Sequence, residues 1–183
     1  MGTSTVTDGE LWIFGYGSLL WDAGFEPVEQ VRARLGGYRR SFCMWSTRYR
    51  GSEARPGLVL ALDAEEGAAC EGLALRADPE EREAVLARLR ERELVTGAYE
   101  ERQVTLALAD GREVPALAYV VRRDHEQYAC VDMETQARTI AGAEGMRGSN
   151  IDYLENTARS LASLGIHDAE LEELQRRART LRP

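Results

Sequence analysis

The segment YEERQVTLALADGREVPALAYVV, residues 99–121, decides the predicted fold. Two runs with strand-like composition flank Asp110–Gly111, and both positions of such a turn tolerate positive φ angles. This pattern predicts an antiparallel β-hairpin. The strands predicted elsewhere do not alternate regularly with helices, so a doubly wound parallel sheet is disfavoured.

Other strands and four helices are predicted outward from this hairpin. The strands are ELWIF (10–14), GLVLALD (57–63) and CEGLALR (70–76), with a short turn containing Gly67 between the last two. The helix starts are marked by capping residues or by proline at the first helical position. The helices are expected over 79–93, 133–143, 151–164 (capped by Ser149 or Asn150 and closed by Gly165) and 169–181.

These elements predict one α+β domain over residues 1–183. We expect a small antiparallel, barrel-like β core with surrounding helices and a helical C-terminal third. A chain of 183 residues is long enough to bury a core of this kind.

Composition excludes several classes of function. The net charge of −8 argues against nucleic-acid binding, which needs a basic face. The chain has no lysine, so all 23 basic residues are arginine, and neither Schiff-base chemistry nor the lysine of a P-loop is available.

The cysteines and the apolar runs argue against disulfides, a zinc site, a signal peptide and a membrane span. Cys43, Cys70 and Cys130 form no CxxC pair, which disfavours a disulfide framework or a zinc site. The leader MGTSTVTDGE has no apolar signal-peptide region, and no run is long enough to cross a membrane. We therefore expect a cytoplasmic protein; the sequence does not predict its oligomeric state.

The glycines in WIFGYGSLL, residues 12–20, stand where a strand would prefer larger side chains. One interpretation is a tight structural turn. Another is an anion site, in which the backbone N–H groups of Gly15–Leu20 converge on a carboxylate or phosphate. A dinucleotide site is disfavoured because the third glycine and the βαβ unit are absent.

Glu93 is the first candidate for chemistry. On a helical wheel it falls at roughly 80° from Val85, on the apolar stripe with Leu86 and Leu89, whereas Glu91 falls on the solvent side. Burial would raise the pKa of the Glu93 carboxyl and suit it to acid–base catalysis near neutral pH. The alternative is that the helix ends before Glu93 and leaves it exposed.

Three other features have both a functional and a structural interpretation. Ser18 as a nucleophile would need a histidine partner, but His125 and His167 lie in polar surface segments. The basic segment RYRGSEARPG (48–57) either contacts an anionic substrate or is a solvated loop. Tyr153 flanks the apolar stripe of its helix, where packing and substrate contact are both open.

Taken together, the motifs resemble the ChaC-type γ-glutamylcyclotransferases. The resemblance covers roughly residues 11–165 and is specific only in combination. LVTGA, after Glu93, is longer than the shortest family versions, and SFCMWST stands where many members have FWQ. The matching segments, in order, are WIFGYGSLLW, GYRRSF, RGSEARPGLVLAL, RERELVTGAYEER, ALAYV and GSNIDYL.

The resemblance implies an enzyme that cleaves glutathione to 5-oxoproline and Cys-Gly on a small barrel-like fold, without a metal or cofactor. The α-amine of the substrate attacks its own γ-carbonyl, and Glu93, just before Gly97–Ala98–Tyr99, acts as general base and then acid. Tyr16, Gly17, Ser18 and Leu19 match the family's substrate loop.

The expected substrate-binding set is wider than this loop. Within it, the N–H groups of Gly15–Leu20 would hold the α-carboxylate. Arg50, Gly51 and Tyr153, from matching segments, complete the set. Alternatives are a cyclotransferase for another γ-glutamyl amine or a non-catalytic protein that binds a small acid.

Overall fold

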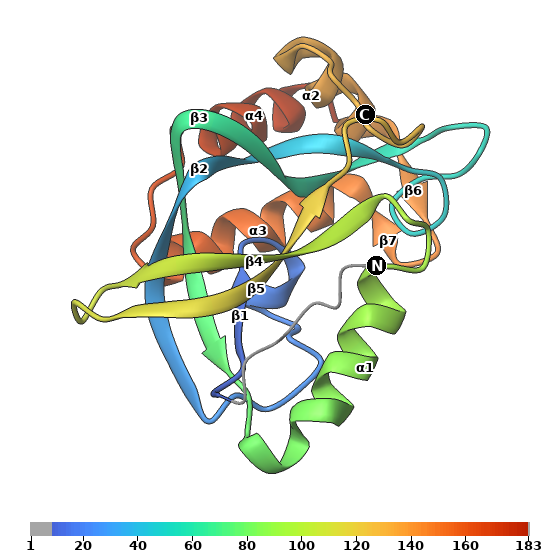
Figure 1. Ribbon diagram of the computed structural model, residues 1–183. Coiled ribbons are helices and arrows are strands. Elements are labelled where there is room, and N and C mark those ends of the chain that lie inside the picture. Colours follow the sequence, from blue (N-terminus) through green and yellow to red (C-terminus); the bar gives the residue numbers. More distant parts are fainter. Residues whose placement is uncertain (1–8, 183) are drawn as a thin grey trace.

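The computed structural model describes residues 9–182, and strands β1 to β5 form a closed barrel (Figure 1). The order around the barrel is β1, β3, β2, β4, β5, and the parallel pair Ile13–Leu117 joins β5 back to β1. The predicted α+β barrel is confirmed. The strands are β1 (Trp12–Gly15), β2 (Glu29–Ser46), β3 (Gly57–Arg76), β4 (Tyr99–Leu108) and β5 (Glu113–Val121).

The hairpin of β4 and β5 forms where the sequence predicts it. Tyr99 pairs with Val121, and the two strands stay in register up to Ala107 and Glu113. Gly111 takes a φ of +91°, which only glycine adopts without strain in such a turn. The Asp110 carboxylate accepts the Arg112 N–H at 3.1 Å and fixes the turn.

The prediction of two strands joined by a turn at Gly67 is wrong. Residues 57–76 form one long, bent strand that pairs with β2 from Glu29–Arg76 to Ser46–Gly57. Gly37 and Gly67, on facing strands, have φ angles of +80° and +82° near a shift in register. The two glycines therefore bend the ribbon of β2 and β3 together. In the sequence, Gly67 alone suggests a turn that reverses the chain.

The partner strand β2 was missed from the sequence. Its first half alternates Val31, Ala33 and Leu35 toward the core with Arg32 and Arg34 toward solvent. This two-residue period is the ordinary signal of a half-buried strand. This pattern predicts a strand that could pair along the whole of β3 and so keep β3 continuous.

The helices start where their caps predict. Asp78 accepts the Glu80 N–H, Asp132 that of Thr135, Ser149 that of Asp152 and Asp168 that of Leu171. A 3-10 turn, η2 (Pro79–Glu81), leads into the first helix. The helices are α1 (Arg82–Glu93), α2 (Met133–Gly142), α3 (Asn150–Ser163) and α4 (Ala169–Thr180).

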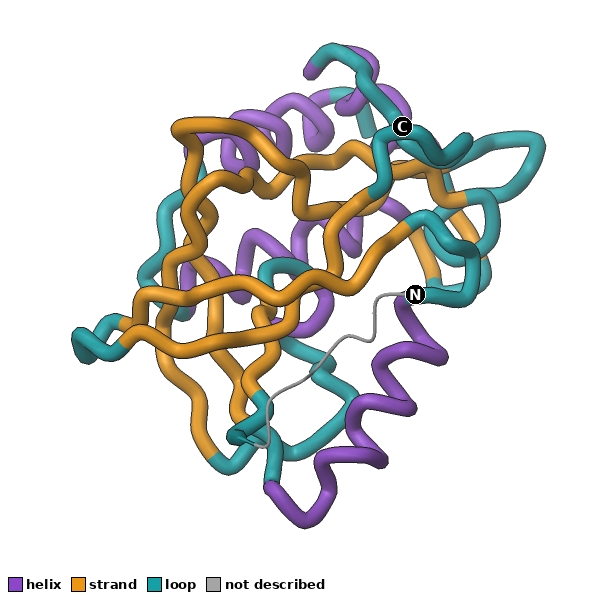
Figure 2. The backbone as a smooth tube through the Cα atoms, in the orientation of Figure 1, coloured by secondary structure: helices purple, strands orange, loops and turns teal. Residues whose placement is uncertain are grey.

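Helices cover the barrel from outside (Figure 2). Val85, Leu86 and Leu89 of α1 pack with Ile13 of β1, whereas the neighbours of Ile13, Trp12 and Phe14, face the barrel interior. This burial on both faces explains the unbroken apolar run of β1. The apolar faces of α2, α3 and α4 pack against a second group that includes Phe42, Leu58 and Leu60.

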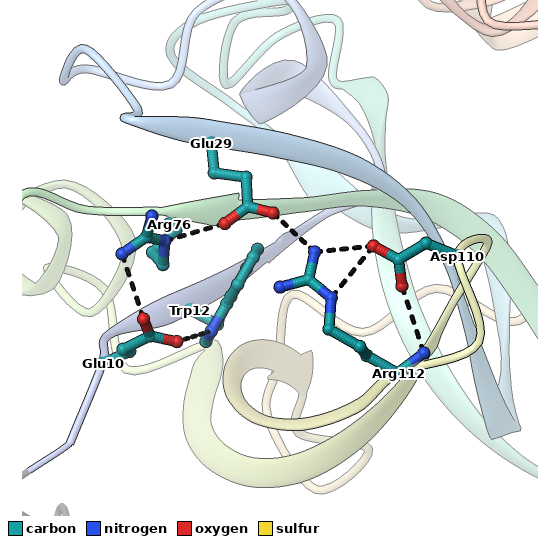
Figure 3. A network of polar contacts seen from close by, with 6 residues as sticks. All are labelled: Glu10, Trp12, Glu29, Arg76, Asp110 and Arg112. Atoms are coloured by element: carbon teal, nitrogen blue, oxygen red, sulfur yellow. Dashed lines mark hydrogen bonds and ion pairs between the residues drawn. The ribbon is translucent and has the colours of Figure 1, made fainter.

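A charged network closes the barrel at the amino end of β1 (Figure 3). Arg76 pairs with Glu10 and Glu29 at 3.0 Å each, and Arg112 pairs with Glu29 and Asp110. The guanidinium carbons of Arg76 and Arg112 lie 5.8 and 5.6 Å from the Trp12 ring centre. We refer to these residues as the paired end of the barrel.

Within residues 9–182, none of the helices is long and apolar enough to span a lipid bilayer. The prediction about the polar leader falls mainly on residues 1–8, which lie outside the described residues, as does Pro183. The single domain over residues 1–183 therefore stays a prediction.

Candidate active site

A small cavity of about 40 Å³ lies at the carboxyl end of β1. This volume accommodates roughly three water-sized groups, which matches one end of a small molecule. The wall is drawn from the loop after β1, from three strands and from the ends of two helices. Its residues are Tyr16, Gly17, Ser18, Leu19, Leu60, Glu93, Tyr99, Tyr119 and Tyr153.

Glu93 is the last residue of α1 and faces this cavity. Its side chain is 16% exposed, while Glu91 lies on the exposed face, as the helical wheel predicts. Burial raises the pKa of the Glu93 carboxyl, and the positive charges of Arg92 and Arg147 partly oppose that shift. The alternative of a helix that ends earlier and exposes Glu93 does not hold.

Arg92 joins the end of α1 to the loop after β1. Its Nη2 donates to Ser18 Oγ at 2.9 Å, its Nη1 donates to the Asp22 carbonyl at 2.8 Å, and its Nε lies 3.1 Å from Glu93 Oε1. The Arg92 guanidinium thus fixes the position of the Glu93 carboxylate relative to the glycine loop. Sequence reasoning missed this residue because it sits in an arginine-rich run that reads as a solvated helix face.

Four tyrosines surround the carboxylate, and the negative charge of Glu93 raises the pKa of each hydroxyl. Burial is the larger cause, so all four stay protonated at neutral pH. Tyr16 donates to the Tyr119 carbonyl at 2.8 Å and Tyr99 to the Leu60 carbonyl at 2.9 Å. Tyr99 and Tyr119 were not among the predicted site residues, although Tyr99 belongs to the motif that follows Glu93.

Tyr153 both packs and lines the cavity. Its ring meets Phe42 and Trp21 edge-on, with centroids 5.9 and 5.8 Å away. Burial raises its pKa to about 12, against a hydrogen bond from the Leu60 backbone that lowers it. Within the described part of the chain the Tyr153 hydroxyl has no recorded acceptor, so its proton remains available to a ligand.

The glycine loop forms a short 3-10 turn, η1 (Ser18–Leu20), after β1. The Leu20 N–H donates to the Gly17 carbonyl at 2.9 Å and is therefore occupied within the loop. A Cβ on Gly17 would lie 3.6 Å from Leu60 Cβ and 3.7 Å from the Tyr153 hydroxyl, which are ordinary contacts. The glycine thus keeps cavity space free, and carboxylate binding by the loop stays a prediction.

Four predicted binding residues lie outside the cavity wall. Gly15 pairs with Leu73 inside β1, and Leu20 ends the 3-10 turn. Arg50 does not line the cavity, and its guanidinium stacks 5.3 Å from the ring centre of Tyr153, which does. A Cβ on Gly51 would lie 2.1 Å from the Gly57 nitrogen, so close backbone packing alone requires a glycine there.

Arg40 anchors the glycine loop from within the fold. Its side chain is 3% exposed, and its Nη1 donates to the Tyr16 carbonyl at 3.0 Å. Its Nε lies 3.2 Å from Asp168, the residue that caps α4. This buried charge was not predicted, although it belongs to the GYRRSF segment.

The site contains no serine–histidine pair. Ser18 Oγ accepts its hydrogen bond from Arg92, His125 Nε2 lies 3.1 Å from the Thr96 carbonyl, and the His167 side chain is 91% exposed. Across residues 9–182, no three His, Cys, Asp or Glu side chains gather where they could hold a metal ion. The arrangement therefore offers one buried carboxylate and several neutral hydroxyl groups.

Comparison with solved structures identifies the class of fold. A γ-glutamyl cyclotransferase specific to glutathione from yeast superposes with a TM-score of 0.86 at 23% sequence identity, covering 94% of this chain and 97% of that one. At this identity the match shows the fold alone.

Sequence comparison then gives the family. The model of the ChaC-like protein family matches residues 11–181, and the chain belongs to this family. A glutathione-specific γ-glutamylcyclotransferase of Escherichia coli is 37% identical over 91% of this chain and 72% of its own length. A mouse protein, glutathione-specific γ-glutamylcyclotransferase 1, is 33% identical over 94% of this chain and 80% of its own.

Proposed function

We propose that the protein is a γ-glutamylcyclotransferase that converts glutathione to 5-oxoproline and Cys-Gly, with Glu93 as the catalytic acid–base group. The observation that carries this proposal is the buried Glu93 carboxylate, with its raised pKa, inside a cavity lined by the glycine loop and four tyrosines. The names of the E. coli and mouse relatives support glutathione as the substrate.

The reaction needs little from the protein besides positioning and proton transfer. The α-amine and the γ-carbonyl belong to one molecule, so folding the substrate brings nucleophile and electrophile together without a second encounter. The new bond joins the α-nitrogen to the γ-carbon, and the bond that breaks joins the γ-carbon to the cysteine nitrogen.

Glu93 handles the proton in this scheme. Its carboxylate removes a proton from the α-ammonium group, which frees the nitrogen lone pair for attack. The same carboxyl group then donates this proton to the departing cysteine nitrogen, and the second proton that the ring nitrogen loses on becoming an amide is taken up by the released amine of Cys-Gly. The raised pKa of Glu93 suits this cycle, because a stronger base accepts the proton more readily and still returns it near neutral pH.

Two groups would hold the substrate. The Tyr153 hydroxyl, protonated and with no acceptor seen in residues 9–182, would donate to the γ-carbonyl oxygen as negative charge develops on it. The N–H groups near the start of the glycine loop would bind the α-carboxylate, with Gly17 leaving room for it.

The test is turnover of glutathione, followed by mass spectrometry of 5-oxoproline and Cys-Gly. Glu93→Gln keeps the volume of the side chain but removes the base, so product should fall to background. Glu91→Gln, on the exposed face of the same helix, is the matched control and should retain full activity. Full activity in Glu93→Gln would contradict the assignment of the base.

Simple γ-glutamyl dipeptides separate the alternatives. Faster turnover of these compounds than of glutathione would indicate another γ-glutamyl amine as substrate. Stabilisation by glutathione against heat, with no product formed, would indicate a binding protein of the same fold.

A further inference from the structure

Two loops beside the cavity are joined into one surface. The loop over residues 47–56 connects β2 to β3, and the second loop lies between the short strands β6 (Glu144–Gly145) and β7 (Gly148–Ser149). Met146 and Arg147 donate their backbone N–H groups to the carbonyls of Arg48 and Tyr49, each at 2.9 Å. A Cβ on Gly145 would lie 2.6 Å from the Gly51 nitrogen, so this contact requires glycine.

Three guanidinium groups gather on this surface, which we term the arginine patch: Arg48, Arg50 and Arg147. The carbon of the Arg147 guanidinium lies 4.6 Å from the Tyr49 ring centre, and that of Arg48 lies 5.7 Å from it. Arg50 stacks on Tyr153 and donates to the Ser149 carbonyl at 3.3 Å.

The arginine patch lacks carboxylate partners. No residue in the described range 9–182 forms an ion pair with any of its three side chains, although the chain has 31 acidic residues against 23 arginines. Asp152 is close enough to raise the pKa of Arg50 but stays beyond ion-pair distance. Most arginines elsewhere are paired, so these positive charges remain available to an anion that the protein itself does not supply.

The arginine patch borders the cavity. Arg50 stacks on Tyr153, which lines the wall, and Arg147 is near enough for its charge to lower the pKa of Glu93. Figure 1 shows β6 and β7 near the carboxyl end of α1, where Glu93 lies. A ligand that leaves the cavity on this side therefore meets the arginine patch next.

The leaving group of glutathione is a dipeptide with a free carboxylate at its far end. With the γ-carbonyl beside Glu93, a two-residue leaving group extends by about 7 Å at most and ends in a free carboxylate. A guanidinium group is the side chain best suited to bind that carboxylate with two parallel hydrogen bonds. In a protein of net charge −8, a local positive surface also offsets the repulsion of an anionic substrate.

We propose that Arg147 and Arg50 bind the free carboxylate of the leaving amine, and that the enzyme thereby selects γ-glutamyl peptides with an acidic end over neutral γ-glutamyl amines. This inference rests on the proposed cyclotransferase function and names the feature of the leaving group that the site requires. Arg50 is held by its stacking on Tyr153, whereas the exposed Arg147 supplies the second donor.

The test compares glutathione with its glycine monoethyl ester, which keeps the reacting atoms and loses one charge. For the unaltered protein, kcat/KM for the acid should exceed that for the ester by about tenfold or more, mainly through KM. Arg147→Ala should lower the value for the acid about tenfold more than the value for the ester, which removes the preference, because the loss of its charge near Glu93 affects both substrates alike. Arg147→Lys should retain part of the preference for the acid over the ester.

Arg159→Ala is the matched control, because Arg159 is an arginine of α3 whose recorded partner is the neutral Asn156. It should leave the ratio of acid to ester unchanged. Measurements at low and high salt add a second readout, since only the acid reaction should slow as salt screens the arginine patch.

Distinct outcomes overturn the inference and the function on which it rests. Equal kcat/KM for acid and ester in the unaltered protein overturns the inference while supporting the cyclotransferase reaction. An Arg147→Ala variant that loses both substrates equally also overturns it, because the arginine would then act on the γ-glutamyl part or on Glu93. Absence of product from both substrates overturns the proposed function and the inference with it.

Discussion

The two ends of β1 hold carboxylates in opposite electrostatic surroundings. At the paired end, hydrogen bonds from Arg112 hold the pKa values of Glu29 and Asp110 below their usual range. At the cavity end, burial raises the pKa of Glu93, and the ion pair with Arg92 only partly offsets it. The strand between these two ends has only four residues. Ionised Glu29 and Asp110 stabilise the fold at one end, whereas ionised Glu93 costs stability at the other.

This difference indicates which end is organised for folding and which for chemistry. For Glu29 and Asp110, the lowered folded-state pKa contributes stability above the unfolded pKa, and that stability is lost as the pH falls through the folded value. For Glu93 the sign reverses, since the native state binds the proton more tightly and loses stability as the pH rises through its raised pKa. Active sites commonly hold such unfavourable charges.

The largest effect is expected from Glu93→Gln. Activity toward glutathione should fall by at least about 100-fold, the usual contribution of a positioned acid–base group. The unfolding midpoint at pH 7 should stay the same or rise, because the variant removes a buried charge. Activity assays and thermal unfolding of the same preparation test both statements. A large fall in the midpoint would mean that Glu93 stabilises the fold as the paired end does.

The next largest effect concerns Gly17. Gly17→Ala places a methyl group between Leu60 and the Tyr153 hydroxyl, where it takes up cavity space without a severe clash. We expect KM to rise about tenfold with little change in stability, since one methyl group in a pocket has effects of this order. Gly36→Ala adds a methyl group where nothing lies within 4 Å and should change neither quantity. Unchanged KM in Gly17→Ala would place the substrate elsewhere.

Arg92 sharpens the comparison through pH. Its positive charge lowers the pKa of Glu93 against the effect of burial, so Arg92→Gln should shift the acidic limb of the kcat/KM profile to higher pH. Arg88→Gln, on the exposed face of α1, should leave the profile in place. A profile that does not move in Arg92→Gln would show that another group controls this limb.

The smallest effect is expected at the paired end. Arg76→Ala removes two ion pairs and the cover over Trp12, and should lower the free energy of unfolding by about 1 kcal/mol. Its kcat and KM should match those of the unaltered protein, because the network lies at the other end of β1. Denaturant unfolding and steady-state kinetics check these statements. Lower activity under conditions where the variant is fully folded would show that the two ends of β1 are not independent.

Local signals predicted most of the elements but not how they assemble. The Asp110–Gly111 hairpin and the capped helix starts depend on residues close in sequence, and they formed as expected. The bend at Gly67 could not be read alone, because its meaning depends on Gly37 in a partner strand. Closure of the barrel likewise rests on a pairing between Ile13 and Leu117, which no local pattern specifies.

The site divides in the same way. Glu93 was found because an amphipathic helix fixes which side chains turn inward, and the glycine loop because its composition is unusual after a strand. Tyr119 and Leu60 lie on strand faces that the helices cover, are ordinary in sequence, and become part of the cavity only through the fold. Arg92 was not predicted as a site residue because an arginine beside a glutamate is typical of a solvent-exposed helix face.

The spread of the cavity wall along the chain sets an order of assembly during synthesis. The strands that close the barrel are complete once residue 121 has emerged, whereas Tyr153 arrives only with α3. A nascent chain that ends before α3 therefore lacks one side of the cavity wall, whatever the state of its strands. The complete cavity is available only to a polypeptide whose synthesis has passed that helix.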